Sequence, residues 1–345
     1  MDRREKVIFQ CNLNGAGLEI GPSINPVVPK CDEYNVETID HTDKNGLLEK
    51  YKSQGLNTDK IEEVDYIWNG ESYTELTGKK NHYDYIIASH VIEHTCDLIG
   101  FFRDCSEILR ENGVLSLVIP DKRRCFDYFR PLTSISNVID RHLNKYTFNS
   151  PGSVYEFYSC VCTSDGNIAW DCPTPPVDVK LSYEVTGAIN AYNDTLNHNK
   201  YIDIHNWVFI KSTFEQIIYE LNCLDLIDLT VAQSFDTEGH EFFVSLVKRS
   251  KPFIASEDER LKLANKAINE LEPTDCDFFY TEQVNGLKDY ISKQSEQIEE
   301  LKEHIEKLIK DQQEQIKGIY NSKTYKTGEK IQKVYRFFKP VKTDN

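Results

Sequence analysis

The sequence predicts an α/β protein whose parallel sheet is doubly wound, with helices on both of its faces. Five short apolar runs are separated by turn residues and by polar or amphipathic segments, as alternating strands and helices require. These runs lie at residues 17–21, 36–40, 64–68, 83–88 and 114–119. Two of them lead into residues able to bind or react, at 21–25 and 89–94. Because ligands bind at the carboxyl edge of such sheets, we expect both segments to face one cleft.

The later elements follow the same pattern after one long interruption. Residues 97–111 have the apolar spacing of a helix that covers the sheet, and Asn112-Gly113 supplies a stop signal before the fifth strand. Residues 122–204 break the rhythm with aromatic residues and with Pro173, Pro175 and Pro176, so we expect an insert that caps the cleft. A helix at 211–222 and strands at 226–235 and 242–248 then complete the sheet.

The amino-acid composition limits where the protein can be located in the cell and what kinds of partner it can bind. The chain has 345 residues, 39% of them apolar, and it shows neither a signal peptide nor an apolar run long enough to span a bilayer. Its ten cysteines form no CxxC pair, which favours reduced thiols and a cytoplasmic location. The net charge is −16 although residues 317–342 are basic, so the rest of the chain is strongly acidic and is not expected to bind nucleic acid.

The C-terminal third differs in character from the rest. After residues 1–250 we expect a helical linker at 251–283, a coiled coil at 284–319 and a basic amphipathic tail at 320–345. The heptad a positions are Val284, Ile291, Ile298, Ile305, Gln312 and Ile319, and the d positions are Leu287, Gln294, Leu301, Leu308 and Gln315. This pattern predicts a homodimer, although a single helix packed on its own domain remains an alternative. The tail suits either an anionic membrane surface or an acidic protein partner.

The first strand and its turn point to a nucleoside cofactor. Gly21 permits a sharp bend after the strand, and amides at the start of a following helix could meet a polar ligand. Asp40 ends the second strand, where a carboxylate suits the two hydroxyls of a ribose. Both a dinucleotide and S-adenosylmethionine fit this arrangement. The turn lacks the further glycines that a pyrophosphate needs, and Glu19 would repel one, so S-adenosylmethionine is favoured over NAD.

These segments resemble the motifs of class I S-adenosylmethionine-dependent methyltransferases, which have a Rossmann-like fold. The resemblance covers about residues 15–250 and is carried by 18–22, 38–41, 84–94 and 109–120. More narrowly, Pro120-Asp-Lys-Arg123, His205-Asn-Trp207 and Phe235-Asp-Thr-Glu-Gly239 are similar to bacterial methyltransferase-domain proteins of O-antigen and surface-polysaccharide assembly. The resemblance implies a cofactor site made of Glu19, Gly21, Pro22, Ser23, Asp40, His41, Ser89 and His90.

Methyl transfer to a hydroxyl requires in-line alignment and a group that takes the proton. The candidate catalytic residues are His90, His94, Asp121 and His205. The basic residues at 122–124 could bind a phosphate or an acidic sugar, or could form a solvated loop. Trp207 could stack on a sugar or belong to the core. No decisive set of metal ligands is evident, so a divalent metal is compatible with the chemistry but is not predicted.

The sequence therefore predicts an S-adenosylmethionine-dependent O-methyltransferase that acts on a sugar or sugar phosphate in the synthesis of bacterial surface glycans. The alternative is a non-catalytic assembly protein with a methyltransferase-like body. Its coiled coil and tail would recruit glycosyltransferases, at the inner face of the membrane.

Overall fold

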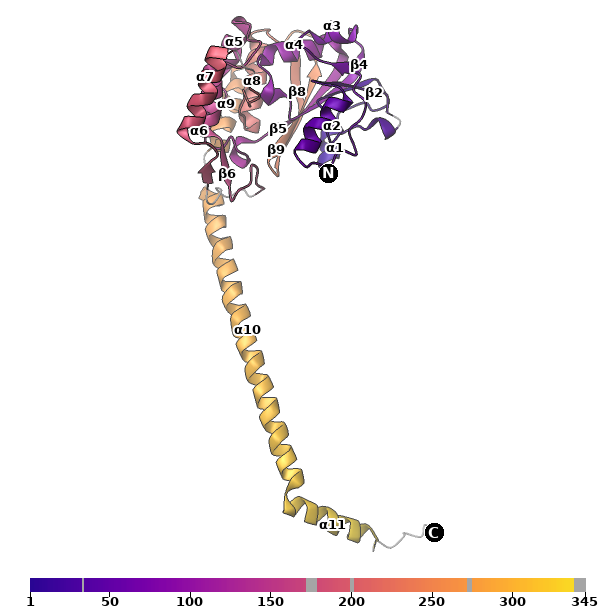
Figure 1. The fold of residues 1–345 in the computed structure, drawn as a ribbon, viewed down its shortest axis with the longest axis vertical. Coiled ribbons are helices and arrows are strands. Elements are labelled where there is room, and N and C mark those ends of the chain that lie inside the picture. Colours follow the sequence, from indigo (N-terminus) through magenta and orange to yellow (C-terminus); the bar gives the residue numbers. More distant parts are fainter. Residues whose placement is uncertain (33, 172–178, 199–201, 272–274, 338–345) are drawn as a thin grey trace. The chain divides into compact units, whose positions relative to one another are not determined.

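The computed structural model describes residues 1–337 apart from 33, 172–178, 199–201 and 272–274, and the side chains of 32, 198, 275–289 and 325 are likewise outside the description. The chain divides into two compact units, residues 1–273 and 274–345. Each unit is described by itself, and most of the strands and helices are labelled in Figure 1.

The first unit is built on a seven-stranded sheet with the order β3-β2-β1-β4-β5-β9-β8. β1 to β5 run parallel, and β9 runs antiparallel to both of its neighbours. The strands are β1 (Gly17–Ile20), β2 (Val36–Asp40), β3 (Tyr66–Ile67), β4 (Tyr83–Ser89), β5 (Leu109–Pro120), β8 (Leu229–Glu238) and β9 (Glu241–Lys248). The sheet confirms the predicted doubly wound α/β class.

Helices of the first unit lie between and beside these strands. They are α1 (Arg3–Ile8), α2 (Lys44–Ser53), α3 (Tyr73–Thr77), α4 (Leu98–Ile108), α8 (Lys211–Cys223) and α9 (Glu257–Leu271), with 3-10 turns η1 (Lys30–Asp32), η2 (Ile92–His94) and η3 (Lys122–Arg124). Local signals explain where they begin: Asp97 accepts the amide of Gly100 at the start of α4, and Asp43 accepts that of Gly46 at the start of α2.

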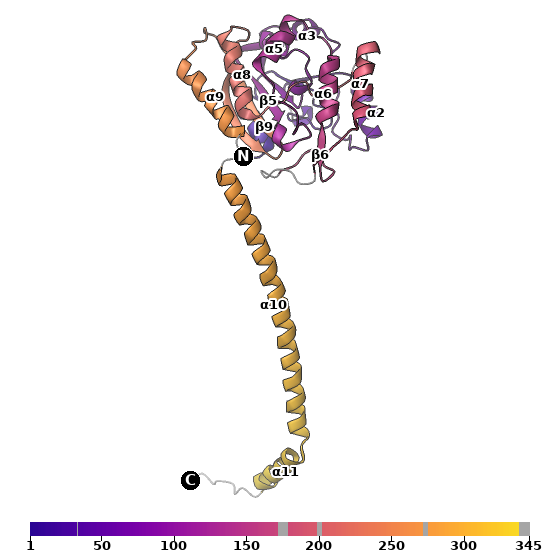
Figure 2. The same ribbon diagram turned by 90° about the vertical axis from the view of Figure 1, so that its left-hand side faces the viewer.

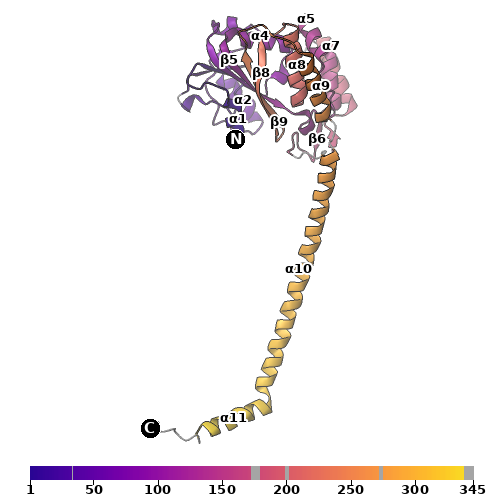
Figure 3. The ribbon, with the colours of Figure 1, turned by 180° about the vertical axis from the view of Figure 1, so that it is seen from behind.

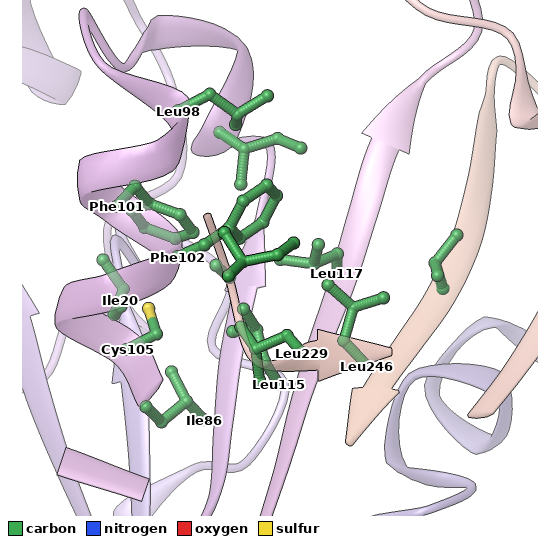
Figure 4. Close-up of a cluster of buried hydrophobic side chains, with 14 of the residues drawn as sticks. Ile20, Ile86, Leu98, Phe101, Phe102, Cys105, Leu115, Leu117, Leu229 and Leu246 are labelled. Carbon is green, nitrogen blue, oxygen red and sulfur yellow. The ribbon is translucent and has the colours of Figure 1, made fainter. Parts of the chain in front are cut away.

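Alternating side chains of the central strands build two cores, one on each face of the sheet. On β4, Ile86 and Ala88 pack with α4 and α8, whereas Tyr85 and Ile87 pack with Val7 of α1 on the opposite face. Figure 4 shows part of the first core, with α4 side chains against those of the strands. Burial on both faces explains why the strands read as continuous apolar runs in the sequence.

Two local expectations were wrong. Helix α4 ends at Ile108, where Leu109 already adopts an extended conformation, and Asn112 and Gly113 lie inside β5 rather than at the helix end. The pairing of β4 with β5 is irregular there, which accommodates residues 110–113. The described residues between β1 and β2 include η1 but no α-helix, so no helix start follows Gly21.

The predicted insert occupies residues 122–204 between β5 and α8. It contains α5 (Ile135–Leu143), α6 (Pro151–Cys160), β6 (Cys162–Ser164), β7 (Val179–Leu181) and α7 (Val185–His198). Helices α6 and α7 lie side by side, as Figure 2 shows, and Val154, Ala191 and Ile204 form a separate small core. The three prolines at 173, 175 and 176 lie outside the described residues.

Helix α9 packs against α8, as Figure 3 shows, so the first unit extends past the expected boundary at residue 250. Arg260 of α9 pairs with Glu220 of α8, with 2.8 Å between Nε and Oε1. Residues 257–271, expected as part of a linker, therefore belong to the body of the first unit.

The second unit consists of α10 (Asp275–Asn321) and α11 (Lys323–Phe337). The predicted coiled-coil range 284–319 lies wholly within α10. Apolar heptad residues are exposed, among them Ile298 (52%), Leu301 (60%) and Ile305 (54%), while Val284 and Leu287 lie outside the described side chains. In the part of the chain that is described, no helix combines the length and the apolarity needed to cross a bilayer.

Candidate functional site

Four neighbouring strands end at one edge of the sheet and carry most of the predicted site residues. Ile20 of β1 is paired with Ile39 of β2 and with Ala88 of β4, and Ser89 is paired with Val118 of β5. The residues that follow are consequently adjacent. This edge is the place that the sequence predicts for the site.

Gly21 brings the two predicted segments into contact. Its φ of +64° lies in the left-handed region, and its amide donates to the carbonyl of Ile39 over 2.8 Å. A Cβ at this position would lie 3.0 Å from Cγ2 of Val91, the residue after His90. The backbone of the first turn therefore approaches the end of β4 as closely as glycine allows. Pro22 and Ser23 continue this turn, and Ser23 also has a positive φ.

Glu19 organises the turn instead of presenting a free carboxylate. It is 2% exposed, and its oxygens accept the amides of Val27 (2.7 Å) and Val28 (3.1 Å). Burial raises the pKa of Glu19, although these two amides act in the opposite direction. Both oxygens are thus engaged in holding residues 21–28 against β1. The resemblance implied that Glu19 belongs to the cofactor site, whereas the geometry gives it a role in loop structure.

At the end of β2, one carboxylate oxygen of Asp40 is available to accept a hydrogen bond. Its Oδ1 is bound by the amide of His41 (2.8 Å) and lies 2.6 Å from Nδ1 of the same residue. Its Oδ2 is buried and has no hydrogen-bond partner among the described residues. Trp68, at the end of β3, donates its amide to the carbonyl of Asp40, and its side chain is 44% exposed. An acidic acceptor and an exposed tryptophan at the ends of two neighbouring strands suit a nucleoside.

His90 lies in an ion-pair network that the sequence did not reveal. Its Nε2 is 2.7 Å from Oε2 of Glu241, and Arg3 donates to both oxygens of Glu241 and to Oγ of Ser89. Burial alone would lower the pKa of His90, but its contacts with Glu241 and Glu93 raise it to about 9. Burial would raise the pKa of Glu241, yet His90 and Arg3 hold it at about 2. His90 is therefore protonated at neutral pH and cannot serve as a base there.

His94 and His205 lie together beside a buried glutamate. Their rings make an edge-to-face contact with centroids 4.7 Å apart. Nδ1 of His94 is 2.9 Å from Oδ1 of Asp203, and Nδ1 of His205 is 2.5 Å from Oδ2 of Asp127. Glu93 is fully buried next to them. Both histidines thus have Nδ1 held by a carboxylate, which leaves Nε2 for a ligand or a proton.

Asp121 is committed to structural contacts. It is fully buried, and its carboxylate accepts from Nε and Nη2 of Arg123 (2.9 and 2.5 Å) and from the hydroxyl of Thr237 (2.6 Å). Arg123 also pairs with Glu270 of α9, so its charge is balanced from two sides. These contacts explain the position of Asp121 without any catalytic function. A catalytic role for Asp121 therefore stays a prediction.

Trp207 is a core residue. Its side chain is 1% exposed, and its indole nitrogen donates to Oγ1 of Thr95 over 3.1 Å. The ring therefore offers no face to a sugar.

A groove of about 910 Å³ lies between η3, α8, the β8 end and α9. Its lining includes five cations, namely Arg123, Arg124, Lys211, Lys262 and Lys266. Four of them are paired with carboxylates, whereas Arg124 donates to the carbonyl of Gly239. Most of the positive charge of the groove is therefore balanced, which weakens it as a phosphate site.

Four residues of this edge were missed from the sequence: Arg3, Asp127, Asp203 and Glu241. Glu93 and His94 lie in the segment 89–94 that the sequence pointed to, because polar residues directly after strand four face the ligand edge. The other partners come from distant segments, and no local pattern pointed to them.

No known family model matches this chain, and no curated protein matches it. Among solved structures, it is similar to a SAM-dependent methyltransferase from Aquifex aeolicus, with 11% identity over 71% of this chain and 89% of the other, and a TM-score of 0.36. A putative S-adenosylmethionine-dependent methyltransferase from Listeria monocytogenes has 9% identity, coverage of 69% and 92%, and a TM-score of 0.34. A possible histamine N-methyltransferase from Thermotoga maritima has 12% identity, coverage of 71% and 88%, and a TM-score of 0.33. Similarities this weak carry no conclusion on activity, and the fold class rests on the strand order above.

Proposed function

We propose that the chain is an S-adenosylmethionine-dependent methyltransferase. The observation that carries the proposal is the buried Oδ2 of Asp40, which has no hydrogen-bond partner among the described residues. It lies at the end of β2, whose neighbours β1 and β3 lead into Gly21 and into Trp68, an exposed residue. A ribose offers two hydroxyl donors to such a carboxylate, and an adenine can stack on an aromatic ring. Ser89 and His90 lie at the adjacent strand end, where the methyl-bearing part of the cofactor would extend.

When bound, S-adenosylmethionine supplies a methyl group on a sulfonium sulfur, which a nucleophile attacks in line. The chain must then orient the acceptor and receive its proton. In the absence of a bound metal ion, Nε2 of His94 and of His205 can receive this proton, and Asp127 holds His205 in one orientation. His90, whose two ring nitrogens face Glu241 and Glu93, instead orders the end of strand β4.

We further propose that the acceptor is a hydroxyl of a sugar or sugar phosphate in bacterial surface-glycan synthesis, in the cytoplasm. Support comes from the sequence resemblance at residues 120–123, 205–207 and 235–239. The insert at 122–204 places Asp127 and Asp203 beside the two histidines, so it contributes to the acceptor side of the edge.

The test is calorimetric titration of the full chain with S-adenosylmethionine. We expect micromolar binding that weakens at least tenfold in Asp40→Asn, because the carboxylate loses its charge where the ribose would bind. Asp59→Asn is the matched control, since Asp59 is exposed in the segment between α2 and β3. Absence of binding by the folded wild-type protein would overturn the proposal, and so would equal loss in both variants.

A second candidate function is favoured by the exposed apolar face of α10. In a non-catalytic assembly protein, the coil would pair two copies, and α11 with the residues after it would recruit glycan-building enzymes or bind the membrane surface. The exposure of Ile298, Leu301 and Ile305 supports a partner for this face. Absence of S-adenosylmethionine binding, together with dimers in light scattering, would favour this candidate.

A further inference from the structure

Three potential metal ligands converge beside the end of β4. Glu93 and His94 belong to η2, and His205 lies in the segment before α8. One ligand atom from each residue lies within 4.8 Å of those of the other two. Glu93 is 0% exposed and His205 is 7% exposed. These three side chains thus form a compact, largely buried cluster with one carboxylate and two imidazoles.

The carboxylate of Glu93 lacks the hydrogen bonds that a buried charge requires. Neither of its oxygens has a hydrogen-bond partner among the described residues. The nearby cation is His90, whose Nδ1 lies 3.4 Å from Oε1, an ion-pair contact without hydrogen-bond geometry. His90 offsets part of the charge of Glu93 but donates no hydrogen bond to either oxygen, so both oxygens can still bind a cation.

Both histidines are held in the way that metal-ligating histidines usually are. Asp203 binds Nδ1 of His94, and Asp127 binds Nδ1 of His205. Asp127 is in turn fixed by Arg130, with 2.8 Å between Nη1 and Oδ1. A carboxylate on one ring nitrogen orients the imidazole and raises the basicity of the other nitrogen. The same arrangement on two independent segments is the second observation that points to an ion.

A neighbouring cluster of similar composition shows the contrast. His90, His240 and Glu241 also have ligand atoms within 4.8 Å of one another. In that cluster both oxygens of Glu241 are bound by Arg3, and one is also bound by His90. Its carboxylate is satisfied by protein donors and needs no ion.

We propose that Glu93, His94 and His205 bind a divalent transition-metal ion, with Asp203 and Asp127 as the carboxylates that orient the two histidines. Two imidazoles and one carboxylate favour Zn²⁺, Mn²⁺ or Fe²⁺ over Mg²⁺ or Ca²⁺. Three protein ligands leave at least one coordination position for water or for an oxygen of the acceptor.

The ion would lie at the sheet edge, next to His90 and to the contact between Gly21 and Val91. Metal binding itself is independent of the proposed function. Only the further role, to bind and polarise the acceptor hydroxyl, rests on the chain being a methyltransferase.

The experiment is a metal titration of the purified, chelator-stripped full chain in the absence of other ligands. Zn²⁺ is followed by calorimetry and Co²⁺ by visible absorption, which also reveals ligation by any of the cysteines as an intense near-ultraviolet band. We expect one equivalent without that band. Binding should weaken at least 100-fold in Glu93→Gln and in His205→Gln, and by about 10- to 100-fold in Asp127→Asn. The matched control is His240→Gln, from the neighbouring cluster, and it should bind as the wild type does.

The proposal is overturned if the folded wild-type chain binds no stoichiometric ion, or if His240→Gln weakens binding as much as Glu93→Gln. Should Glu93→Gln fail to fold by tryptophan fluorescence, His94→Asn takes its place, because the His94 side chain is 36% exposed. Failure of the proposed function is separate: loss of S-adenosylmethionine binding with retained Zn²⁺ binding would refute the enzyme and leave the metal site.

Discussion

The buried arginine behind His205 gives the sharpest prediction for stability. The Arg130 side chain is 1% exposed, donates from Nη1 to Asp127 over 2.8 Å and from Nη2 to Glu156 over 3.2 Å. In Arg130→Met the side chain keeps its approximate length but loses its charge. Asp127 then remains buried with the His205 ring and the Cys125 thiol as its hydrogen-bond partners. Removing one partner of a buried ion pair costs about 3–5 kcal/mol, so we expect the free energy of unfolding to fall by that amount.

Urea unfolding followed by tryptophan fluorescence measures this change. All three tryptophans, at 68, 170 and 207, lie in the first unit, so the signal reports that unit even in the full chain. With a slope of about 3 kcal/mol per molar urea, the midpoint should move down by about 1–1.7 M.

The matched control removes an arginine from an exposed pair. Arg110 contacts Asp84 at 2.9 Å, and its side chain is 49% exposed. Solvent screens such a pair, so Arg110→Met should cost about 1 kcal/mol or less. Similar shifts in the two variants would refute the reasoning, since they would mean that burial does not decide the strength of the pair.

Three further outcomes are expected. Burial, assisted by nearby carboxylates, raises the pKa of Asp104 from 3.8 to about 6. The ionised form of Asp104 therefore destabilises the fold progressively as the pH rises from 3.8 through 6. Asp104→Asn should raise the free energy of unfolding by about 1 kcal/mol at pH 8, a value that allows for solvent screening. At about pH 4 the substitution should not raise it. Gly21→Ala places a Cβ at positive φ and 3.0 Å from Val91, so it should cost about 1–2 kcal/mol in urea unfolding and weaken S-adenosylmethionine binding; an unchanged midpoint would contradict the turn geometry. Leu301→Asp at a d position should convert the dimer to a monomer in light scattering, whereas Lys310→Asp at an outer f position should leave it intact; a monomeric wild type would end the coiled-coil hypothesis.

The sheet was predictable because its strands are buried on both faces. Runs such as 83–88 are apolar throughout, and this pattern together with the turn residues located β1, β2, β4 and β5. The end of α4 was not predictable. Asn112-Gly113 is a typical stop signal, yet pairing of Leu109 with Tyr83 draws the chain into β5 three residues earlier. Tertiary hydrogen bonding outweighed the local signal.

For the candidate site, the sequence located the strand-end residues but not their partners. Gly21, Asp40 and His90 follow from short motifs at known places in an α/β sheet. What each side chain does depends on residues far away: Glu241 is 151 residues from His90, and Asp127 is 78 residues from His205. The contact with Glu241 favours the protonated form of His90. The residue type alone suggested a base, whereas this contact makes His90 a cation.

The contact of Arg3 with Glu241 also has a consequence for the order of assembly during synthesis. The two residues are 238 positions apart, and at about 5–20 residues per second a ribosome needs roughly 10–50 s to pass from one to the other. Throughout that interval α1 has no β9 to bind, and His90, once it is synthesised, lacks the carboxylate that links it to Arg3. The network of Arg3, His90 and Glu241 therefore forms only after the β8–β9 hairpin has been synthesised. A truncated chain that stops before β9 would retain most of the strands but would lack this network.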